Sequence, residues 1–155
     1  MKNFLLPTVQ STQKIAQAIA RLSMPKDVIL LEGDLGAGKT EFARAFIRAL
    51  TYDEMIVPSP TFTLVEIYEA SIGAIWHFDL YRLKSEEEIW DLGIEEAFAQ
   101  GISLIEWPER LGKIFRVKNY LKISLNLNNN DKIRELFLAP FGNWESRLEK
   151  IVLDE

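Results

Sequence analysis

The sequence predicts a single α/β domain, residues 1–155, whose mixed and mostly parallel sheet is flanked by helices and carries antiparallel hairpins. Short apolar runs, which are typical of buried strands, alternate along the chain with amphipathic helical patterns. One of these runs leads through a glycine-rich loop into a helix. With 155 residues, of which 48% are hydrophobic, the chain is the size of one domain and can form a packed core.

Two helices, a buried strand and a hairpin are predicted in the first half of the chain. Ser11 or Thr12 can cap a first helix, whose apolar residues recur at helical spacing up to Leu22. The apolar run at 28–31 predicts a buried strand, and the pattern at 41–50 predicts a second helix. After these come an irregular segment at 52–60, a strand at 62–69, a turn at 70–73 and a partner strand at 74–80.

The second half begins with an acidic helical pattern. Ser85 can cap a helix that starts with three glutamates, because the helix dipole favours acids in the first turn. Gly93 divides this helix from a second helical piece at 94–99. The remaining predicted elements are a short buried strand at 102–105, strands at 121–127 and 133–138 joined by an asparagine-rich turn at 128–131, and a final helix at about 144–153.

The loop at 33–40, Gly-Asp-Leu-Gly-Ala-Gly-Lys-Thr, matches the phosphate-binding pattern G-x-x-x-x-G-K-[ST] in full. In such a P-loop, backbone N–H groups point at phosphate oxygens, at the positive end of the following helix. We therefore expect a nucleoside triphosphate to bind here, with Lys39 at its β- and γ-phosphates and Thr40 as a magnesium ligand. The residues expected to bind the nucleotide in this segment are Gly33, Asp34, Leu35, Gly36, Ala37, Gly38, Lys39, Thr40 and Glu41.

Hydrolysis of a triphosphate also needs an acid near the magnesium ion and a group that orients the attacking water. Glu106 follows the predicted strand at 102–105, at the end where open α/β sheets place their ligands. We expect its carboxylate to hold magnesium, and the length of its side chain suits contact through a metal-bound water. The alternative is a solvated strand end, where acids are common.

Asp79 is the second candidate acid. Period-2 alternation places it on the same face of a predicted strand as Ile75 and His77. It could hold the water shell of magnesium or position the attacking water, and the alternative is a cap or an ion pair with Arg82. His77 is the only histidine, and we expect it to be a hydrogen-bonded structural residue.

The segment Ser59-Pro60-Thr61 has the placement of a switch loop, because it follows the helix of the P-loop. The hydroxyl of Thr61 is expected to touch magnesium or the γ-phosphate. The alternative is a turn that proline makes rigid before the next strand.

Composition excludes several other kinds of protein. Without cysteine, the chain has no disulfide framework, thiol catalysis or thiolate metal site. The start has too short an apolar stretch for a signal peptide, and no segment approaches the roughly 20 apolar residues that span a bilayer. We expect a cytoplasmic protein without membrane contact. The net charge of −5 disfavours a broad grip on nucleic acid, so any tRNA is expected to be contacted mainly through partner proteins.

Four motifs occur in order at 33–40, 59–64, 77–83 and 105–109, and together they closely resemble the TsaE family, formerly called YjeE. The resemblance runs from about residue 12 to 109. It implies a compact P-loop ATPase domain that hydrolyses ATP to ADP with Mg²⁺ while bound to the TsaD–TsaB pair. In that system TsaD transfers a threonylcarbamoyl group to adenosine 37 of tRNAs that read codons beginning with A. A TsaE-like protein would reset or license this machine and would not itself transfer the group.

The resemblance also implies roles for single residues. Thr40 matches the magnesium ligand of the family, Glu106 its Walker B acid, and Asp79 an aspartate needed for hydrolysis. Matches to residues near the nucleotide are Trp107, Thr12 near the base and ribose, and either Lys132 or Arg134 as a basic residue of the late hairpin.

Two alternative functions stay open at this point: a kinase for a small metabolite, and a module that senses ATP without hydrolysing it. The chain has no arginine-rich lid for an acceptor and no Asn-Lys-x-Asp motif for guanine, which disfavours a kinase and a GTPase. The acidic segment at 85–96 is either a docking surface or a solvated helix.

Overall fold

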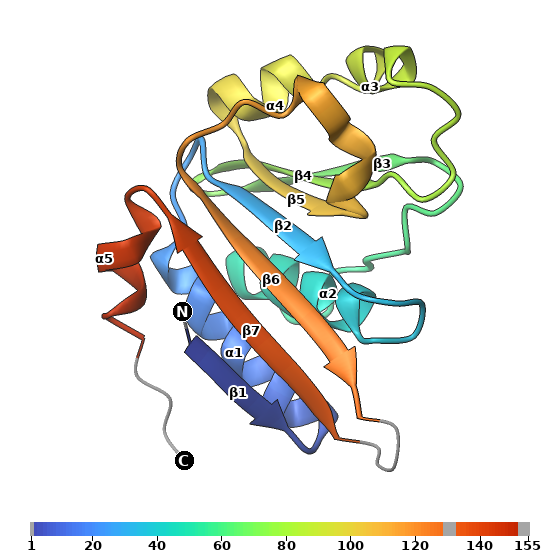
Figure 1. Cartoon of the computed structure of the whole chain (residues 1–155). Helices are drawn as coiled ribbons and strands as arrows, with labels where there is room; N and C mark the ends of the chain where they lie inside the picture. Colours follow the sequence, from blue (N-terminus) through green and yellow to red (C-terminus); the bar gives the residue numbers. More distant parts are fainter. Residues whose placement is uncertain (1, 129–132, 152–155) are drawn as a thin grey trace.

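The structure is a computed structural model that describes residues 2–128 and 133–151. Helices cover both faces of one sheet (Figure 1). The elements are β1 (Lys2–Leu6), α1 (Val9–Leu22), β2 (Val28–Glu32), α2 (Lys39–Leu50), β3 (Val65–Ala70), β4 (Gly73–Asp79), α3 (Glu87–Asp91), α4 (Ile94–Gln100), β5 (Ile102–Glu106), the 3₁₀ helix η1 (Pro108–Ile114), β6 (Tyr120–Leu127), β7 (Arg134–Phe141) and α5 (Trp144–Leu148).

The strands described form one sheet of seven in the order β1-β7-β6-β2-β5-β4-β3. The central strands β6, β2, β5 and β4 pair in parallel, whereas β3, β7 and β1 join by antiparallel pairing. Among the seven strands of the described residues, β3 and β7 run opposite to the other five. The predicted mixed and mostly parallel sheet is therefore confirmed. As a result, the carboxyl ends of four central strands meet at one edge of the sheet.

Alternation along the buried strands divides the core into two layers. In β2, Ile29 and Leu31 pack with α1 and α2, while Val28 and Leu30 pack on the opposite face with α3, α4 and η1. Burial on both faces explains why the sequence of β2 is a continuous apolar run. Along β4, Ile75 belongs to the first layer and Phe78 to the second, as the alternation predicted.

Several boundaries differ from the predictions. The first helix is capped by Thr8, whose hydroxyl accepts a hydrogen bond from the N–H of Ser11 at 3.1 Å, so it begins before the predicted cap. Ser85 makes no capping bond, because Glu86 occupies the N-cap position of α3. The strand predicted from residue 62 begins at Val65, since a turn with the left-handed Leu64 (φ +68°) precedes it.

Two elements were not predicted, and two predicted segments extend beyond the described residues. β1 is an edge strand that pairs with β7 from the other end of the chain, and η1 is a short 3₁₀ helix. Neither has a long periodic pattern in the sequence. The hairpin of β6 and β7 is confirmed, but residues 129–132 of its turn lie outside the described residues. α5 ends at Leu148, earlier than the predicted end at about 153, and residues 152–153 of the predicted helix also lie outside the described residues.

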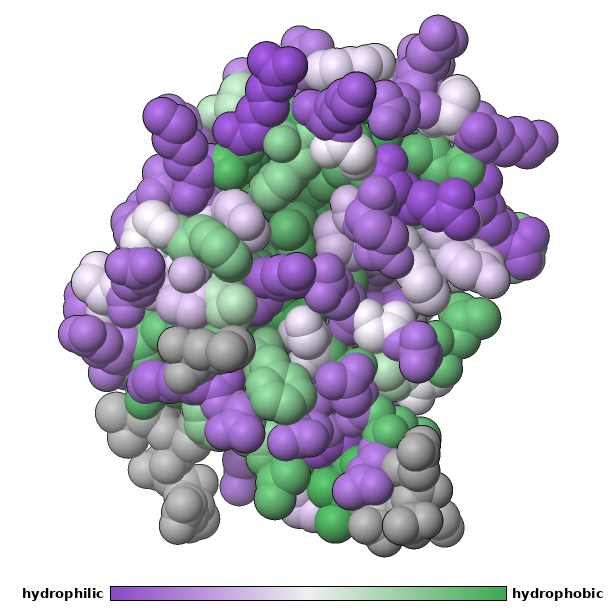
Figure 2. Space-filling model, in the orientation of Figure 1, coloured by the Kyte–Doolittle hydropathy of each residue, from purple (hydrophilic) through white to green (hydrophobic). Residues whose placement is uncertain are grey.

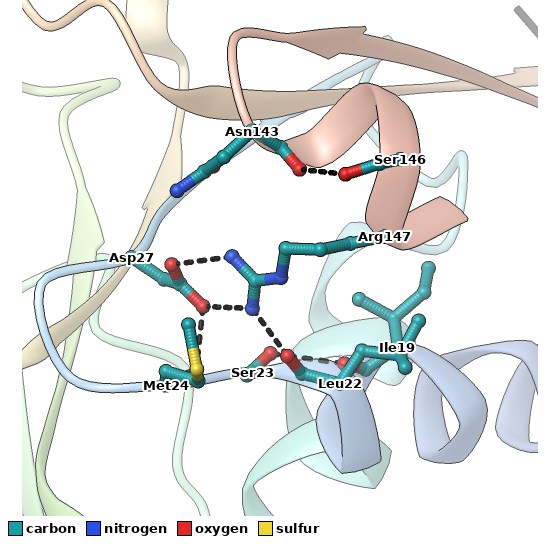
Figure 3. A network of polar contacts seen from close by, with 8 residues as sticks. All are labelled: Ile19, Leu22, Ser23, Met24, Asp27, Asn143, Ser146 and Arg147. Atoms are coloured by element: carbon teal, nitrogen blue, oxygen red, sulfur yellow. Dashed lines mark hydrogen bonds and ion pairs between the residues drawn. The ribbon is translucent and has the colours of Figure 1, made fainter. Parts of the chain in front are cut away.

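A buried ion pair closes the edge of the sheet opposite to the carboxyl ends of the central strands. Arg147 of α5 reaches Asp27, the residue before β2, with Nη1–Oδ1 2.8 Å and Nη2–Oδ2 2.6 Å (Figure 3). Nη2 also donates to the carbonyl of Leu22 at the end of α1, and the guanidinium lies 3.8 Å from the ring centroid of Trp144. The pair therefore joins α5 to the α1–β2 connection.

The charged residues, which are 26% of the sequence, contribute to a largely hydrophilic surface on the face drawn in Figure 2. Hydrophilic side chains crowd the upper part of the molecule in Figure 2, where Figure 1 draws α3 and α4. A cavity of about 400 Å³ lies beside these helices; its lining residues are Trp90, Ile94, Glu95, Phe98, Ala99 and Ile114. None of the helices in the described ranges has the length and apolar character needed to cross a membrane.

Candidate nucleotide site

A cavity of about 240 Å³ lies at the carboxyl edge of the central strands. It brings together segments that are distant in the sequence: the P-loop, the loop before β3, the ends of β4 and β5, and the start of β7. The residues that line it are Leu35, Gly36, Gly38, Lys39, Thr40, Glu41, Thr61, Asp79, Glu106, Trp107 and Arg134.

The P-loop can curl here because its glycines have no side chain. Gly38 has φ +106°, and a Cβ at this position would lie 3.1 Å from Nε of Arg134. A Cβ on Gly33 would collide with the carbonyl oxygen of Leu125. The loop ends at the start of α2, where the first N–H groups of a helix have no intrahelical acceptor. N–H groups and a positive helix end of this kind favour the binding of anions.

Lys39 is a buried cation that makes no ion pair within residues 2–128 and 133–151. Its residue is only 5% exposed, its ammonium donates to the carbonyl of Gly33, and Nζ lies 3.6 Å from the ring centroid of Trp107. Burial lowers the pKa of Lys39 below its ordinary value of 10.5, while the negative charges of Glu106 and Asp79 act in the opposite direction. An anion in the cavity would supply the charge partner that this lysine lacks.

The backbone of Trp107 directs its ring toward this lysine. Trp107 follows β5 directly and has φ +58° and ψ +52°, a left-handed conformation that is unfavourable for a bulky residue. On the other side, the ring of Tyr81 lies 4.8 Å from that of Trp107, centroid to centroid. The left-handed turn thus places an aromatic face in the lining of the cavity.

Asp79 is held by two hydrogen bonds at the end of β4. The hydroxyl of Thr61 donates to its Oδ2 at 3.1 Å, and the N–H of Tyr81 donates to its Oδ1 at 3.0 Å. The hydroxyls of Ser59 and Thr61 are themselves 2.7 Å apart. The alternative ion pair with Arg82 is absent from the described part of the chain, because that guanidinium lies over the ring of Phe62, 4.5 Å from its centroid.

Glu106 is adjacent to Asp79 in the sheet, since the two residues are paired in the parallel register of β4 and β5. It is 2% exposed, so it is not a solvated strand end. His77 Nε2 lies 2.6 Å from its Oε2, and His77 itself is fully buried. The expected hydrogen-bonded histidine is therefore found, and its partner is a residue of the candidate site.

Most of the predicted site residues meet around this cavity, and a few do not. Gly33, Asp34 and Ala37 belong to the loop without lining the cavity. Thr12 is fully buried in α1 and lies outside the lining; its hydroxyl has no hydrogen-bond partner among residues 2–128 and 133–151. Of the two basic residues of the late hairpin, Arg134 lines the cavity and Lys132 lies outside the described residues.

Two residues near the site were not singled out from the sequence. Tyr81 contacts the ring of Trp107, and Ser59 contacts the hydroxyl of Thr61. Ser59 belongs to the motif at 59–64 and Tyr81 to the motif at 77–83. Only the folded backbone shows that their side chains contact residues of the cavity lining.

The donors around the cavity suit magnesium that is bound together with phosphate. They are the hydroxyls of Thr40 and Thr61 and the carboxylates of Asp79 and Glu106, and oxygen is the ligand that Mg²⁺ prefers. In the described ranges no three His, Cys, Asp or Glu side chains converge as a metal-binding group. Magnesium in nucleotide sites is commonly held by one or two protein groups, phosphates and water, so the donor set fits that mode.

Comparisons with known proteins agree on one family. Residues 6–136 match the family model described as threonylcarbamoyl adenosine biosynthesis protein TsaE. The chain is 47% identical to a tRNA threonylcarbamoyladenosine biosynthesis protein TsaE from Rickettsia felis, over 93% of this chain and 82% of that protein. It is 38% identical to the protein of the same name from Bacillus subtilis, over 92% and 88% of the two chains.

A solved structure is similar over nearly the whole chain. The crystal structure of YdiB from Bacillus subtilis matches with a TM-score of 0.79 and 30% sequence identity. The match covers 97% of this chain and 93% of that one, so the order of elements described above is shared almost from end to end.

Proposed function

The chain belongs to the TsaE family of threonylcarbamoyl adenosine biosynthesis proteins, and from that premise we propose that it is a magnesium-dependent ATPase. Its family membership links it to tRNA threonylcarbamoyladenosine biosynthesis. The observation that carries the proposal is the meeting of Lys39, Asp79 and Glu106 around one cavity. These residues come from three separate segments and supply the charges that phosphoryl transfer requires.

Triphosphate binding is proposed at the P-loop. In the free protein the ammonium of Lys39 contacts a carbonyl and an aromatic ring, and both are weaker partners than a phosphate. Arg134 adds a second cation to the lining of the cavity. Its Nε is buried and has no hydrogen-bond partner among the described residues, so this donor is available to a phosphate oxygen. Both cations therefore favour a bound polyanion.

Thr40, Thr61 and Glu106 are the residues proposed to hold magnesium. When bound, the ion neutralises charge on the phosphate oxygens. Asp79 is proposed to orient the attacking water. Because the Thr61 hydroxyl and the Tyr81 N–H already fix its carboxylate, this acceptor needs little reorganisation before the reaction.

The chain has no arginine-rich lid that would close over an acceptor, which favours action through partner proteins. We propose that the chain resets or licenses the TsaD–TsaB pair in the cytoplasm, while TsaD modifies adenosine 37 of tRNAs that read codons starting with A. With a net charge of −5, it would contact tRNA mainly through that pair.

ATP turnover with magnesium tests the proposal, measured for the chain alone and then with a TsaD–TsaB preparation and tRNA. We expect slow turnover that rises with the pair. Asp79→Asn should lower turnover at least about 100-fold and largely retain ATP binding, because it removes a charge that acts in the transition state. Asp91→Asn changes an exposed acid of α3 outside the cavity and should leave turnover unchanged.

Other outcomes would assign other functions. Turnover that appears only with a small acceptor would indicate a kinase, and ATP binding without turnover in any mixture would indicate an ATP-sensing module. Turnover that is indifferent to the pair would contradict the partner-dependent part of the proposal.

A further inference from the structure

The buried side chain that the proposed function does not use is His77. It is fully buried in the sheet, it is absent from the lining of the cavity, and its Nε2 is 2.6 Å from Oε2 of Glu106. We assign the hydrogen to Nε2, so that the imidazole donates to the carboxylate of Glu106. The imidazole thus contacts the candidate magnesium acid from the side of the core.

Among the described residues, the side chain of His77 makes a polar contact with Glu106 alone. The other ring nitrogen, Nδ1, is buried and has no hydrogen-bond partner in the described residues. A histidine that served the core alone would be expected to satisfy both nitrogens, because an unpaired buried polar atom is unfavourable. Within the described residues, the one hydrogen bond of the ring therefore goes to the site.

The register of the two strands explains how one bond orients the carboxylate. Asp79 and Glu106 are paired across β4 and β5, and His77 lies two residues before Asp79 on the same face. The imidazole consequently lies on the same face of the sheet as the two acids, on the side away from the carboxyl edge. His77 contacts Oε2 of Glu106. The other oxygen, Oε1, accepts no hydrogen bond within the described residues and is therefore available to a ligand in the cavity that Glu106 lines.

We propose that His77 is a positioning residue, which holds the carboxylate of Glu106 in the orientation that binds magnesium with the nucleotide. The role rests on the proposed ATPase function and acts through Glu106 alone. A side chain that donates a hydrogen at the position of Nε2 would preserve it, and one that does not reach this position would lose it.

Two substitutions separate this role from packing. His77→Gln can place an amide N–H near the position of Nε2, whereas the amide of His77→Asn is too short to reach Glu106. We expect His77→Asn to lower kcat at least about tenfold and to raise the magnesium concentration for half-maximal turnover at least about fivefold. His77→Gln should stay within about threefold of the wild type in both quantities.

A second measurement needs no turnover. Calorimetric titration with ATP, with and without magnesium, gives the factor by which magnesium tightens ATP binding, and His77→Asn should reduce that factor at least about fivefold. Ser103→Ala is the matched control. It removes the unpartnered hydroxyl of another fully buried residue, on neighbouring β5, and should leave the factor unchanged.

The background of Glu106→Ala decides between positioning and a general structural effect. There His77→Asn should have no further effect on turnover or on magnesium-dependent binding, because the group that it orients is gone. An equal loss in both backgrounds, or an unchanged magnesium factor in His77→Asn, would overturn the proposal. If the wild type has no turnover, the proposed function fails, and the role of His77 is then decided by the binding factor alone.

Discussion

Two cations that are largely removed from water, Arg147 and Lys39, lie at opposite edges of the same sheet. Arg147 closes the edge before β2, where it makes two short bonds to Asp27 and a third to a backbone carbonyl (Figure 3). Lys39 lies at the carboxyl edge, beyond β2, and makes no ion pair among the described residues. Both are largely removed from water, but only one has its charge compensated within the protein.

The difference shows what a structural and a functional buried charge require. Removing a charge from water is unfavourable unless an opposite charge and hydrogen bonds replace the lost solvent. Asp27 supplies both for Arg147, and the arrangement is complete without a ligand. Among the described residues Lys39 is left with a carbonyl and a ring, so its charge is available for the phosphate that we propose to bind there.

Asp27→Asn should have the largest effect and should act on stability alone. It leaves the guanidinium of Arg147 buried without its counter-charge, which costs about 3–5 kcal/mol. Urea unfolding measures this as a lower free energy of unfolding. The ATP affinity of the folded variant should stay as in the wild type, since Asp27 is at the opposite edge from the cavity.

The double variant Asp27→Leu with Arg147→Met is the control for this prediction. It removes both charges together, so it should recover most of the lost stability. If the double variant is as unstable as Asp27→Asn, the loss arises from packing and not from the unpaired charge.

Lys39→Met should reverse this pattern at the other edge. The charge-assisted bond to phosphate is lost, so the affinity for ATP should fall about 30-fold to 100-fold, or about 2–3 kcal/mol. The free energy of unfolding of the nucleotide-free protein should not decrease at neutral pH, because the removed charge has no carboxylate partner. Calorimetric titration and urea unfolding measure the two quantities.

An exposed lysine provides the control for Lys39→Met. Lys113 lies in η1, outside the cavity lining, and Lys113→Met should change neither quantity. A loss of unfolding free energy in Lys39→Met of the size seen in Asp27→Asn would remove the distinction between the two cations.

The same contrast decides what could be predicted from the sequence. The P-loop is local, and the strand and helix around it follow from apolar periodicity, so its place in the fold was predicted correctly. Glu106 and Asp79 could be singled out because each ends a buried strand, and the structure places these two ends side by side.

The parts that could not be predicted depend on contacts between distant segments. Arg147 and Asp27 are 120 residues apart, and neither has a neighbouring pattern that indicates the other. β1 joins the sheet through pairing with β7, and its own pattern is too short to predict that partner. Thr8 caps α1, and the sequence did not identify it because Thr8, Ser11 and Thr12 are all residues that can cap a helix.

Thr61→Val tests whether polar contacts at the open edge serve the reaction rather than the fold. It removes the hydroxyl that donates to Asp79, so turnover should fall about tenfold, or about 1.4 kcal/mol. The free energy of unfolding should change by less than about 0.5 kcal/mol, because Thr61 is partly exposed. Steady-state ATP turnover and urea unfolding measure the two effects.

Thr63→Val is the matched control. The hydroxyl of Thr63 makes a comparable bond of 3.0 Å to Glu66, but it is exposed and lies outside the lining of the cavity. Turnover should be unchanged in this variant. Equal losses of turnover in Thr61→Val and Thr63→Val would mean that the loop before β3 acts as a whole and that the contact with Asp79 has no special part.

The smallest expected effect is the contribution of Lys39 to the pH dependence of stability. Because burial lowers the pKa of Lys39, folded molecules bind fewer protons than unfolded ones between that lowered pKa and 10.5. The free energy of unfolding of the nucleotide-free protein should therefore rise with pH across this window.

Comparison with Lys39→Met isolates this contribution, since the variant should lack the rise. Tyr68 has the opposite influence above its ordinary pKa of 10.0, because burial raises the pKa of its hydroxyl and the unfolded chain loses that proton first. That influence is common to both proteins and cancels in the difference between them. Parallel pH profiles for the wild type and the variant would show that the ammonium of Lys39 is as stable in the free protein as in water, and the contrast with Arg147 would then not be one of charge compensation.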